Sequence, residues 1–282
     1  MSIRIVTDST CDLPESVVSK YGIAVAPLYI NFGQKGYLDG VELSRQEFYE
    51  RLPTYNPLPT TAAPGTDMFR KAYDKLAGEG ASEILSIHIS ISLSATVDVA
   101  RMAAQETHAV PVTVLDSRQL SLGTGFLVER AAQAAAEGCS MSEIMALLQD
   151  QISRTHVIAA LDTLEYLRRS GRMNSAVAAL GTLLQMKPLL KMHDGSPTAE
   201  RVRTNNGATE RLVSLMSDLA PFERVAFVHS HAPAKSDALR QKVLHLLPAG
   251  EIPSVEITPV LGANIGPGAS GFAVVTARRS GE

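Results

Sequence analysis

Residues 83–115 read EILSIHISISLSATVDVARMAAQETHAVPVTVL, and the pattern of this stretch decides the fold class. Its first part, residues 83–90, is a compact run of isoleucine and leucine that is typical of a buried β-strand. Residues 94–107 predict a helix, and residues 112–115 predict a second strand. A strand, a helix and a second strand in this order indicate a βαβ unit, in which the two strands lie parallel.

The same alternation extends through the first half of the chain. Further strands and helices are expected at residues 3–7, 23–30, 66–77, 119–137 and 140–153. Ser44, with Glu47 three residues later, predicts a capped helix that continues to about residue 52. We therefore expect an α/β domain with a mostly parallel sheet over residues 1–154.

The second half has a different pattern. Strands are expected at residues 157–161, 186–192, 198–204, 224–229, 255–259 and 272–277, and helices at 163–169, 175–185, 210–219 and 235–247. The HDGSP turn at residues 193–197 predicts a hairpin between two of these strands. This mixture indicates a smaller α+β domain over residues 155–282, with a ligand held between or beside the two domains.

Composition excludes several classes of protein. The chain has 282 residues, is 45% hydrophobic and has a net charge of 26 − 29 = −3, which argues against disorder and against a nucleic-acid-binding surface. Residues 257–277 lack charge, but glycine and proline interrupt them too often for a membrane span. No signal-like segment opens the sequence, so we expect a cytoplasmic protein without stable membrane insertion, with Cys11 and Cys139 as free thiols.

The common catalytic signatures are missing from the sequence. It contains no GxxxxGK[ST], GxSxG or HExxH motif. Residues 266–271 match GxGxxG, but they precede a strand near the C-terminus rather than opening the helix of a βαβ unit. His229 and His231 have no further ligands at metal-binding spacing. We therefore expect no catalytic residue, no metal and no cofactor.

Hydroxyl and glycine residues instead gather at predicted chain turns. These motifs are DST at residues 8–10, TTAAPG at 60–65, SISLSAT at 90–96 and NIGPG at 264–268. The first three fall where parallel strands end, which is where α/β sheets bind ligands. Serine and threonine hydroxyls beside the start of a helix form a site for an anion. Ser94 as a simple helix cap, and Thr61 as a simple turn residue, remain alternatives.

These motifs resemble those of the DegV family of fatty-acid-binding proteins. The matching runs are IVTDSTCDLP from Ile5, VAPLYI from Val25, TTAAP from Thr60, ISLSATVDVA from Ile91, VLDSRQLSLGTG from Val114, DTLEYLRRSGRM from Asp162, LLQMKPLL from Leu183 and NIGPGASG from Asn264. The resemblance implies two domains with a buried acyl chain and a non-catalytic carrier function. The carrier would be the lipid-presenting subunit of a bacterial fatty acid kinase, offering the carboxylate of a long-chain fatty acid to a separate catalytic subunit for phospholipid synthesis.

The resemblance also assigns residues to this function. Thr61 and Ser94 match the family's head-group residues, and Asn264 stands where the family has a histidine. We expect these three side chains to form an uncharged cradle for the carboxylate. Arg201 and Arg203 are expected on one face of a strand, where they would dock the kinase or would simply be solvated.

The sequence leaves two aspects of the function open, namely the lining of the tail-binding tunnel and the class of protein. Leu28, Ile158, Leu183 and Met186 would line the tail-binding tunnel or belong to the ordinary core. The alternatives to a carrier are a sensor or regulator that binds another anionic amphiphile, and an acyl hydrolase that uses Ser94. No base for such a hydrolase is evident near Ser94 in the sequence. The densest basic spot is RRSGR at residues 168–172.

Overall fold

A four-stranded parallel sheet forms the first half of the computed structural model, which describes residues 2–172 and 187–278. Its strands, in spatial order, are β2 (Ala24–Ala26), β1 (Ile3–Asp8), β6 (Glu83–His88) and β7 (Val112–Asp116). Helices α3 (Thr66–Gly78) and α4 (Thr96–Glu106) cover one face, and α5 (Ser121–Ala136) covers the other. Helices α1 (Glu15–Tyr21) and α6 (Met141–Arg154) pack against α5. The predicted parallel α/β arrangement is confirmed.

A six-stranded mixed sheet forms most of the second half. Its strands, in spatial order, are β10 (Ser196–Val202), β9 (Lys187–His193), β8 (Thr155–Ala160), β13 (Ser270–Thr276), β11 (Phe222–His229) and β12 (Ser254–Glu256). Only β11 and β12 pair in parallel. Helices α9 (Asn205–Leu219) and α10 (Pro233–Lys242) lie on the outer face, and α5 and α6 lie on the inner face. The predicted division at residue 154, just before β8, stays a prediction.

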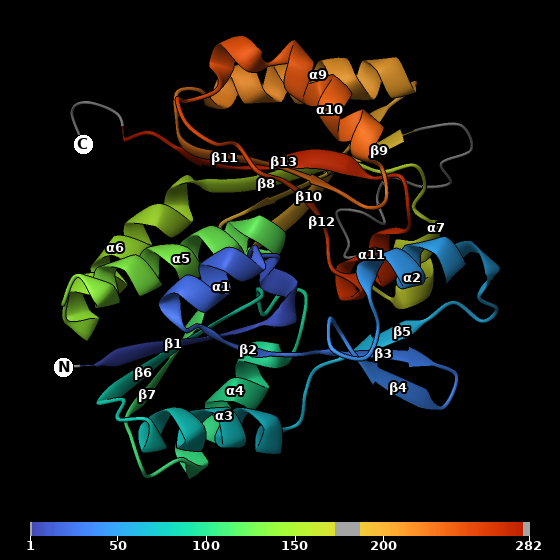
Figure 1. Cartoon of the computed structure of the whole chain (residues 1–282). Helices are drawn as coiled ribbons and strands as arrows, with labels where there is room; N and C mark the ends of the chain where they lie inside the picture. The colour runs from blue at the N-terminus through green and yellow to red at the C-terminus, as the bar shows by residue number, and fades with distance from the viewer. Residues whose placement is uncertain (1, 173–186, 279–282) are drawn as a thin grey trace.

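A small three-stranded sheet stands beside these layers. It contains β4 (Lys35–Leu38), β3 (Tyr29–Phe32) and β5 (Thr60–Ala62), all antiparallel. Helices α2 (Arg45–Arg51), α7 (Glu165–Ser170) and α11 (Pro259–Ile265) lie next to it, as Figure 1 shows. Two of these elements differ from the prediction. Residues 60–65 were expected as a chain turn but include β5, and residues 255–259 were expected as a strand but end in the first turn of α11.

The elements stack in five alternating layers (Figure 1). From one side to the other these are α9 with α10, the six-stranded sheet, α5 with α6, the four-stranded sheet, and α3 with α4. The largest apolar cluster lies in the middle of this stack and joins residues of both sheets, such as Leu85 and Ala273, through α5 residues such as Leu127. Helix α5 is buried almost all round because it packs between the two sheets.

Local signals explain several element boundaries. Ser44 accepts a hydrogen bond from the Glu47 amide, so the predicted cap of α2 is confirmed. The predicted hairpin is also present, with its turn at Asp194 and Gly195 in positive-φ conformations. The strand predicted at residues 198–204 ends at Val202, because Thr204 caps α9 instead. The helix predicted at residues 175–185 falls outside the described residues.

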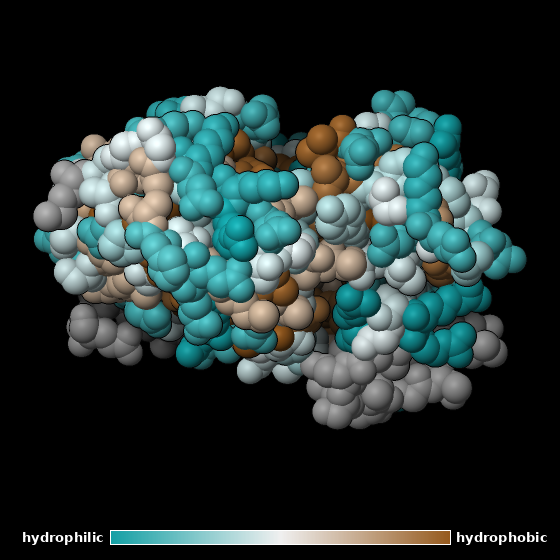
Figure 2. All heavy atoms as spheres, turned by 90° about the horizontal axis from the view of Figure 1, so that it is seen from below, coloured by the Kyte–Doolittle hydropathy of each residue, from teal (hydrophilic) through white to brown (hydrophobic). Residues whose placement is uncertain are grey.

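The face in Figure 2 is mainly hydrophilic or neutral, and its apolar areas are separate patches. The large apolar side chains that are exposed are scattered along the chain: Val25, Val41, Ile91, Met102 and Leu244. No helix within residues 2–172 and 187–278 has the length and apolar character needed to cross a bilayer. Both cysteines are free, as expected; Cys11 is buried and Cys139 is partly buried.

Candidate functional site

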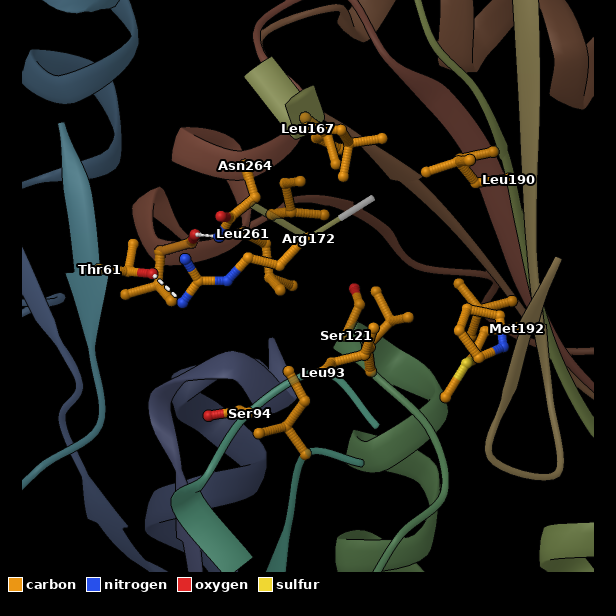
Figure 3. A pocket seen from close by; sticks show the side chains of 18 of the residues that line it. Thr61, Leu93, Ser94, Ser121, Leu167, Arg172, Leu190, Met192, Leu261 and Asn264 are labelled. Carbon is orange, nitrogen blue, oxygen red and sulfur yellow. Dashed lines mark hydrogen bonds between the residues drawn. The ribbon is translucent and has the colours of Figure 1, made fainter. Parts of the chain in front are cut away.

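A mostly apolar cavity of about 150 Å³ lies between the inner face of the six-stranded sheet and the three-stranded sheet. Alternate residues of β8 and β9 form one wall, because Val157 pairs with Met192 and Ala159 pairs with Leu190 on the same face. Leu93 and helix α11 supply further apolar surface. Figure 3 shows polar groups gathered at the opposite end from Leu190 and Met192. A molecule that fits this space therefore has an apolar body and a polar end.

The structure brings together the three residues predicted to bind the head group. Thr61, Ser94 and Asn264 all line this cavity, although they come from three distant segments of the chain. Each is only half buried, so each lies where the cavity meets the surface. This shared location is what the sequence predicted for a site.

Thr61 lies on a strand rather than in a turn. It is the middle residue of β5 and pairs with Ile30 of β3, whose side chain is fully buried. This pairing fixes the backbone at residues 60–62, so the Thr61 hydroxyl has a defined direction. In Figure 3 that hydroxyl points into the polar end of the cavity.

Ser94 lies in the loop that joins β6 to α4. The helix begins at Thr96 with Ala95 as its N-cap, so the expectation that Ser94 begins or caps the helix is wrong. The Ser94 hydroxyl instead bonds the Thr96 hydroxyl at 2.8 Å and accepts from the Thr96 amide at 3.3 Å. Because either hydroxyl can be the donor, the Ser94 hydrogen becomes available to an anion when Thr96 donates to Ser94.

A buried polar chain anchors the start of this loop. Asp8 accepts hydrogen bonds from the amide of Ile89 and pairs with His88 Nδ1, both at 3.0 Å, and His88 Nε2 bonds Ser86 Oγ at 2.7 Å. Burial would raise the pKa of Asp8, but the interactions with His88, together with hydrogen bonds from Thr10 and the Ile89 amide, outweigh burial and hold that pKa below its usual value. The ends of β1 and β6 are thus tied together directly beneath the cavity, which Ile89 lines.

Asn264 lies in α11, where sequence analysis had placed only a loop. Its side-chain amide donates to the carbonyl of Val260 in the previous turn at 2.8 Å, which orients the side chain. The helix ends at Gly266 with φ +77°, and a Cβ there would lie 2.3 Å from the Tyr166 ring of α7. Only glycine therefore allows α7 and α11 to approach this closely.

Buried carboxylates hold the other end of α11. Asp12 accepts hydrogen bonds from the Thr258 amide at 2.7 Å and from Ser121 Oγ at 2.6 Å, and it lies 3.3 Å from the guanidinium of Arg45. Asp39 accepts a hydrogen bond from the Thr258 hydroxyl. Burial raises the pKa of Asp12 to about 6 and that of Asp39 to about 6, which the hydrogen bonds and Arg45 only partly offset. This cluster joins the N-terminal segment, α5 and α11.

A cation that sequence analysis did not assign also lies at the polar end. Arg172 follows α7, and its guanidinium donates to Thr61 Oγ1 at 3.3 Å and to the Ser170 carbonyl at 2.8 Å. Figure 3 shows this contact beside Asn264. The expectation of an uncharged cradle is therefore wrong. The basic spot at residues 168–172 was the available signal, but nothing local in the sequence indicates that it meets Thr61.

Among the described residues, the Ser94 hydroxyl has no base as a partner. Over residues 2–172 and 187–278, no histidine or carboxylate is hydrogen-bonded to the Ser94 hydroxyl. A serine–histidine–aspartate chain does occur, at Ser86, His88 and Asp8, but all three side chains are fully buried and none lines the cavity. That chain continues to the Tyr73 hydroxyl at 2.8 Å, so it connects core elements rather than facing a substrate.

The remaining predicted residues have different locations. Leu28 lines the cavity, whereas Ile158 faces the other side of β8 and packs in the core beneath α9. Leu183 and Met186 lie outside the described residues. Arg201 lies on β10, but Arg203 follows the end of that strand, so the expectation that both lie on one strand face is wrong. Both arginines are exposed.

Comparison with known proteins gives one consistent family. A family profile described as "Uncharacterised protein, DegV family" matches residues 2–277. A DegV domain-containing protein of Deinococcus radiodurans is 37% identical over 281 residues, which cover 97% of this chain and 98% of that protein.

Two solved structures are similar over nearly the whole chain. A DegV family protein from Thermus thermophilus, described with fatty acid binding, has a TM-score of 0.90 and 36% identity, covering 98% of this chain and all of that one. DegV from Bacillus subtilis, described as a fatty acid binding protein, has a TM-score of 0.88 and 28% identity with the same coverage.

Proposed function

The chain belongs to the DegV family, and from this premise we propose that it binds one long-chain fatty acid in the cavity beneath β5 and α11. The observation that supports this most directly is the convergence of Thr61, Ser94 and Asn264 on one end of an apolar cavity. The fatty acid binding described for the relatives from Thermus thermophilus and Bacillus subtilis supports the same ligand class.

In this proposal the apolar wall supplies most of the affinity. Each buried methylene contributes about 0.8 kcal/mol, so a tail of roughly 14 methylenes contributes on the order of 11 kcal/mol before ordering and association costs. The carboxylate sits among Thr61, Ser94 and Asn264, with the Arg172 guanidinium close enough to balance its charge. The polar groups then fix which end of the ligand reaches the surface.

Extraction of the purified protein with organic solvent, followed by mass spectrometry, tests the ligand. We expect one long-chain acid for each chain, and uptake of added palmitic or oleic acid by delipidated protein. Protein that holds no acid and takes none up contradicts the proposal. Recovery of a different anionic amphiphile would favour the sensor alternative instead.

The second part of the proposal is that the bound acid is presented to a separate fatty acid kinase. Because the head-group residues are only half buried, a partner can reach the carboxylate without removing the tail from the cavity. The chain itself then needs no catalytic residue, and it works in the cytoplasm, where the kinase finds ATP. Arg201 and Arg203, both exposed, are the proposed docking residues.

A reconstituted assay tests this second part separately. ATP, a bacterial fatty acid kinase catalytic subunit and the loaded protein should together form acyl phosphate. Arg201→Gln and Arg203→Gln should lower that rate while fatty acid uptake stays unchanged. An unaltered rate in the double variant would remove these arginines from docking, and a rate that does not depend on the loaded protein would exclude presentation.

A further inference from the structure

A second cavity lies on the opposite face of the six-stranded sheet. It has a volume of about 220 Å³ and is enclosed by the outer face of β8 and β13 and by helices α9 and α10. The alternation of β8 separates the two cavities, since Ala159 faces the first and Ala160 faces the second. Among the described residues, Leu161, just after the strand, is the one that borders both cavities.

A buried hydroxyl without a partner belongs to this cavity. Ser270 is 6% exposed, and its Oγ makes no hydrogen bond in the described part of the chain. It lies on the same face of β13 as Phe272 and Val274, which pack in the core beneath α9 and α10. Its side chain is therefore on the cavity side of the sheet. A buried hydroxyl left unpaired is destabilising, so a polar partner here is favourable.

The mouth of the cavity has an excess of positive charge. Lys235 Nζ donates to both carboxylate oxygens of Asp162, at 2.8 and 2.9 Å, and to the Gly268 carbonyl at 2.8 Å. Lys187 Nζ makes only long contacts, of 3.3 Å to the Asp162 carbonyl and 3.4 Å to its carboxylate. Two ammonium groups therefore share one carboxylate, and Lys187 keeps an N–H that no described residue accepts.

The first turn of α9 adds to the positive electrostatic potential at the mouth of the cavity. Asn205 and Asn206 line the cavity, and they follow Thr204, whose hydroxyl accepts the Gly207 amide. The first amide groups of a 15-residue helix have no carbonyl partner within the helix and bear partial positive charge. The rest of the wall is apolar and includes Leu212 and Leu239.

We propose that this second cavity binds a small organic carboxylate with a short apolar body. The anionic group sits between Lys187 and the first turn of α9 and accepts a hydrogen bond from the Ser270 hydroxyl, and the body contacts Leu212 and Leu239. One net positive charge matches a monoanion better than a phosphate dianion. The inference does not depend on the proposed fatty acid function, because the two cavities share no described residue except Leu161.

Calorimetric titration of the full chain with hexanoate tests this site. The protein is first saturated with oleic acid, and that separate titration reports on the first cavity. Hexanoate should then bind with a 1:1 ratio, whereas acetate, which lacks the body, and 1-hexanol, which lacks the charge, should each bind at least about fivefold more weakly. No heat from hexanoate at millimolar concentration overturns the proposal, whatever oleic acid does.

Variants locate the binding. Ala238 of α10 is exposed and lines the cavity, so Ala238→Leu should fill it and abolish hexanoate binding. Ala234→Leu places the same side chain one turn earlier on the helix, at an exposed residue that does not line the cavity, and should leave binding unchanged. Lys187→Gln should weaken hexanoate about fivefold and leave 1-hexanol unaffected. Hexanoate binding that survives both Ala238→Leu and Lys187→Gln, or tighter binding of butyl phosphate than of hexanoate, refutes the assignment.

Discussion

The guanidinium of Arg172 gives the sharpest test of how the first cavity recognises its ligand. We expect Arg172→Gln to weaken binding of palmitic acid and to leave binding of hexadecanol unchanged, because the two ligands share a tail and differ in charge. Thr61 Oγ1 lies 3.3 Å from the guanidinium, and a carboxylate bonded to that hydroxyl lies roughly 2.7 Å from it. The two charges are therefore about 4 Å apart, within a range of roughly 3 to 6 Å.

This separation sets the magnitude. Opposite unit charges at 4 Å attract by about 1 kcal/mol in water and about 4 kcal/mol at an effective dielectric constant of 20. Arg172 is exposed, so solvent screening favours the lower part of that range, or about 1–2 kcal/mol. The dissociation constant for palmitic acid should rise about 5- to 30-fold.

Displacement of a fluorescent fatty acid by palmitic acid and by hexadecanol measures both constants. Arg169→Gln is the matched control, because Arg169 belongs to the same basic run but pairs with Glu165 at 2.6 Å and does not line the cavity. Arg172→Lys should restore part of the preference for the acid, since it keeps the charge but loses the planar fork. Equal weakening of acid and alcohol by Arg172→Gln would show that the side chain only supports the fold, and an unchanged ratio would remove it from recognition.

Three further predictions follow from the same contacts. Thr61→Ala and Ser94→Ala should each weaken fatty acid retention by roughly 1–3 kcal/mol, measured by the displacement assay, if each leaves a carboxylate oxygen unpaired. The raised pKa values of Asp12 and Asp39, about 6 each, mean that the folded chain binds these protons more tightly than the unfolded chain. Each carboxyl therefore stabilises the fold less as pH rises from about 4 to 7, by on the order of 3 kcal/mol, and the free energy of unfolding of Asp12→Asn in urea, measured relative to the unaltered chain, should rise by about that amount over this range. The pKa of His156, which burial lowers to about 4, changes stability in the opposite direction in both chains and cancels in this difference. Gly266→Ala should lower the midpoint of thermal unfolding by roughly 2–4 °C for each kcal/mol of strain, and a midpoint equal to that of the unaltered chain would contradict the contact with Tyr166.

The parallel half of the fold was predictable because its signals are local. Each strand of the four-stranded sheet is a short apolar run, and each helix between strands has its own start and stop residues. Ser44 with Glu47 identified α2 from a four-residue pattern. Such signals depend only on residues that are close together in the sequence, so a single sequence is enough to predict these elements.

The elements that sequence analysis missed lack those signals. Helix α11 is a single seven-residue segment with most of its side chains buried, so it shows no alternation of apolar and polar faces. Strand β5 has three residues and is stabilised by its pairing with β3 rather than by its own composition. Both form because of tertiary contacts, which a short pattern does not contain.

Some residues of the candidate site could likewise be predicted from the sequence, and one could not. Thr61, Ser94 and Asn264 were singled out by motifs and by family resemblance, and the structure brings them to one cavity. Arg172 was visible only as part of a basic spot, because its role depends on a contact across 111 positions of sequence. The positive charge at the head-group end of the cavity was therefore missed, because the sequence predicted an uncharged cradle.

The residues of the site come from three separate segments of the fold, and ligand binding is therefore linked to the stability of the whole chain. Thr61 depends on the pairing of β5 with β3, Ser94 on the anchoring of its loop by Asp8, and Asn264 on the attachment of α11 to Asp12. Loss of any one attachment displaces one wall of the cavity. A ligand that needs all three walls binds only the folded chain, so at a free concentration 100 times its dissociation constant it adds about 2.7 kcal/mol to the free energy of unfolding. Two contributions therefore stabilise the fold around the cavity. The buried hydrogen-bond networks position the cavity walls, and a bound ligand makes separation of those walls less favourable.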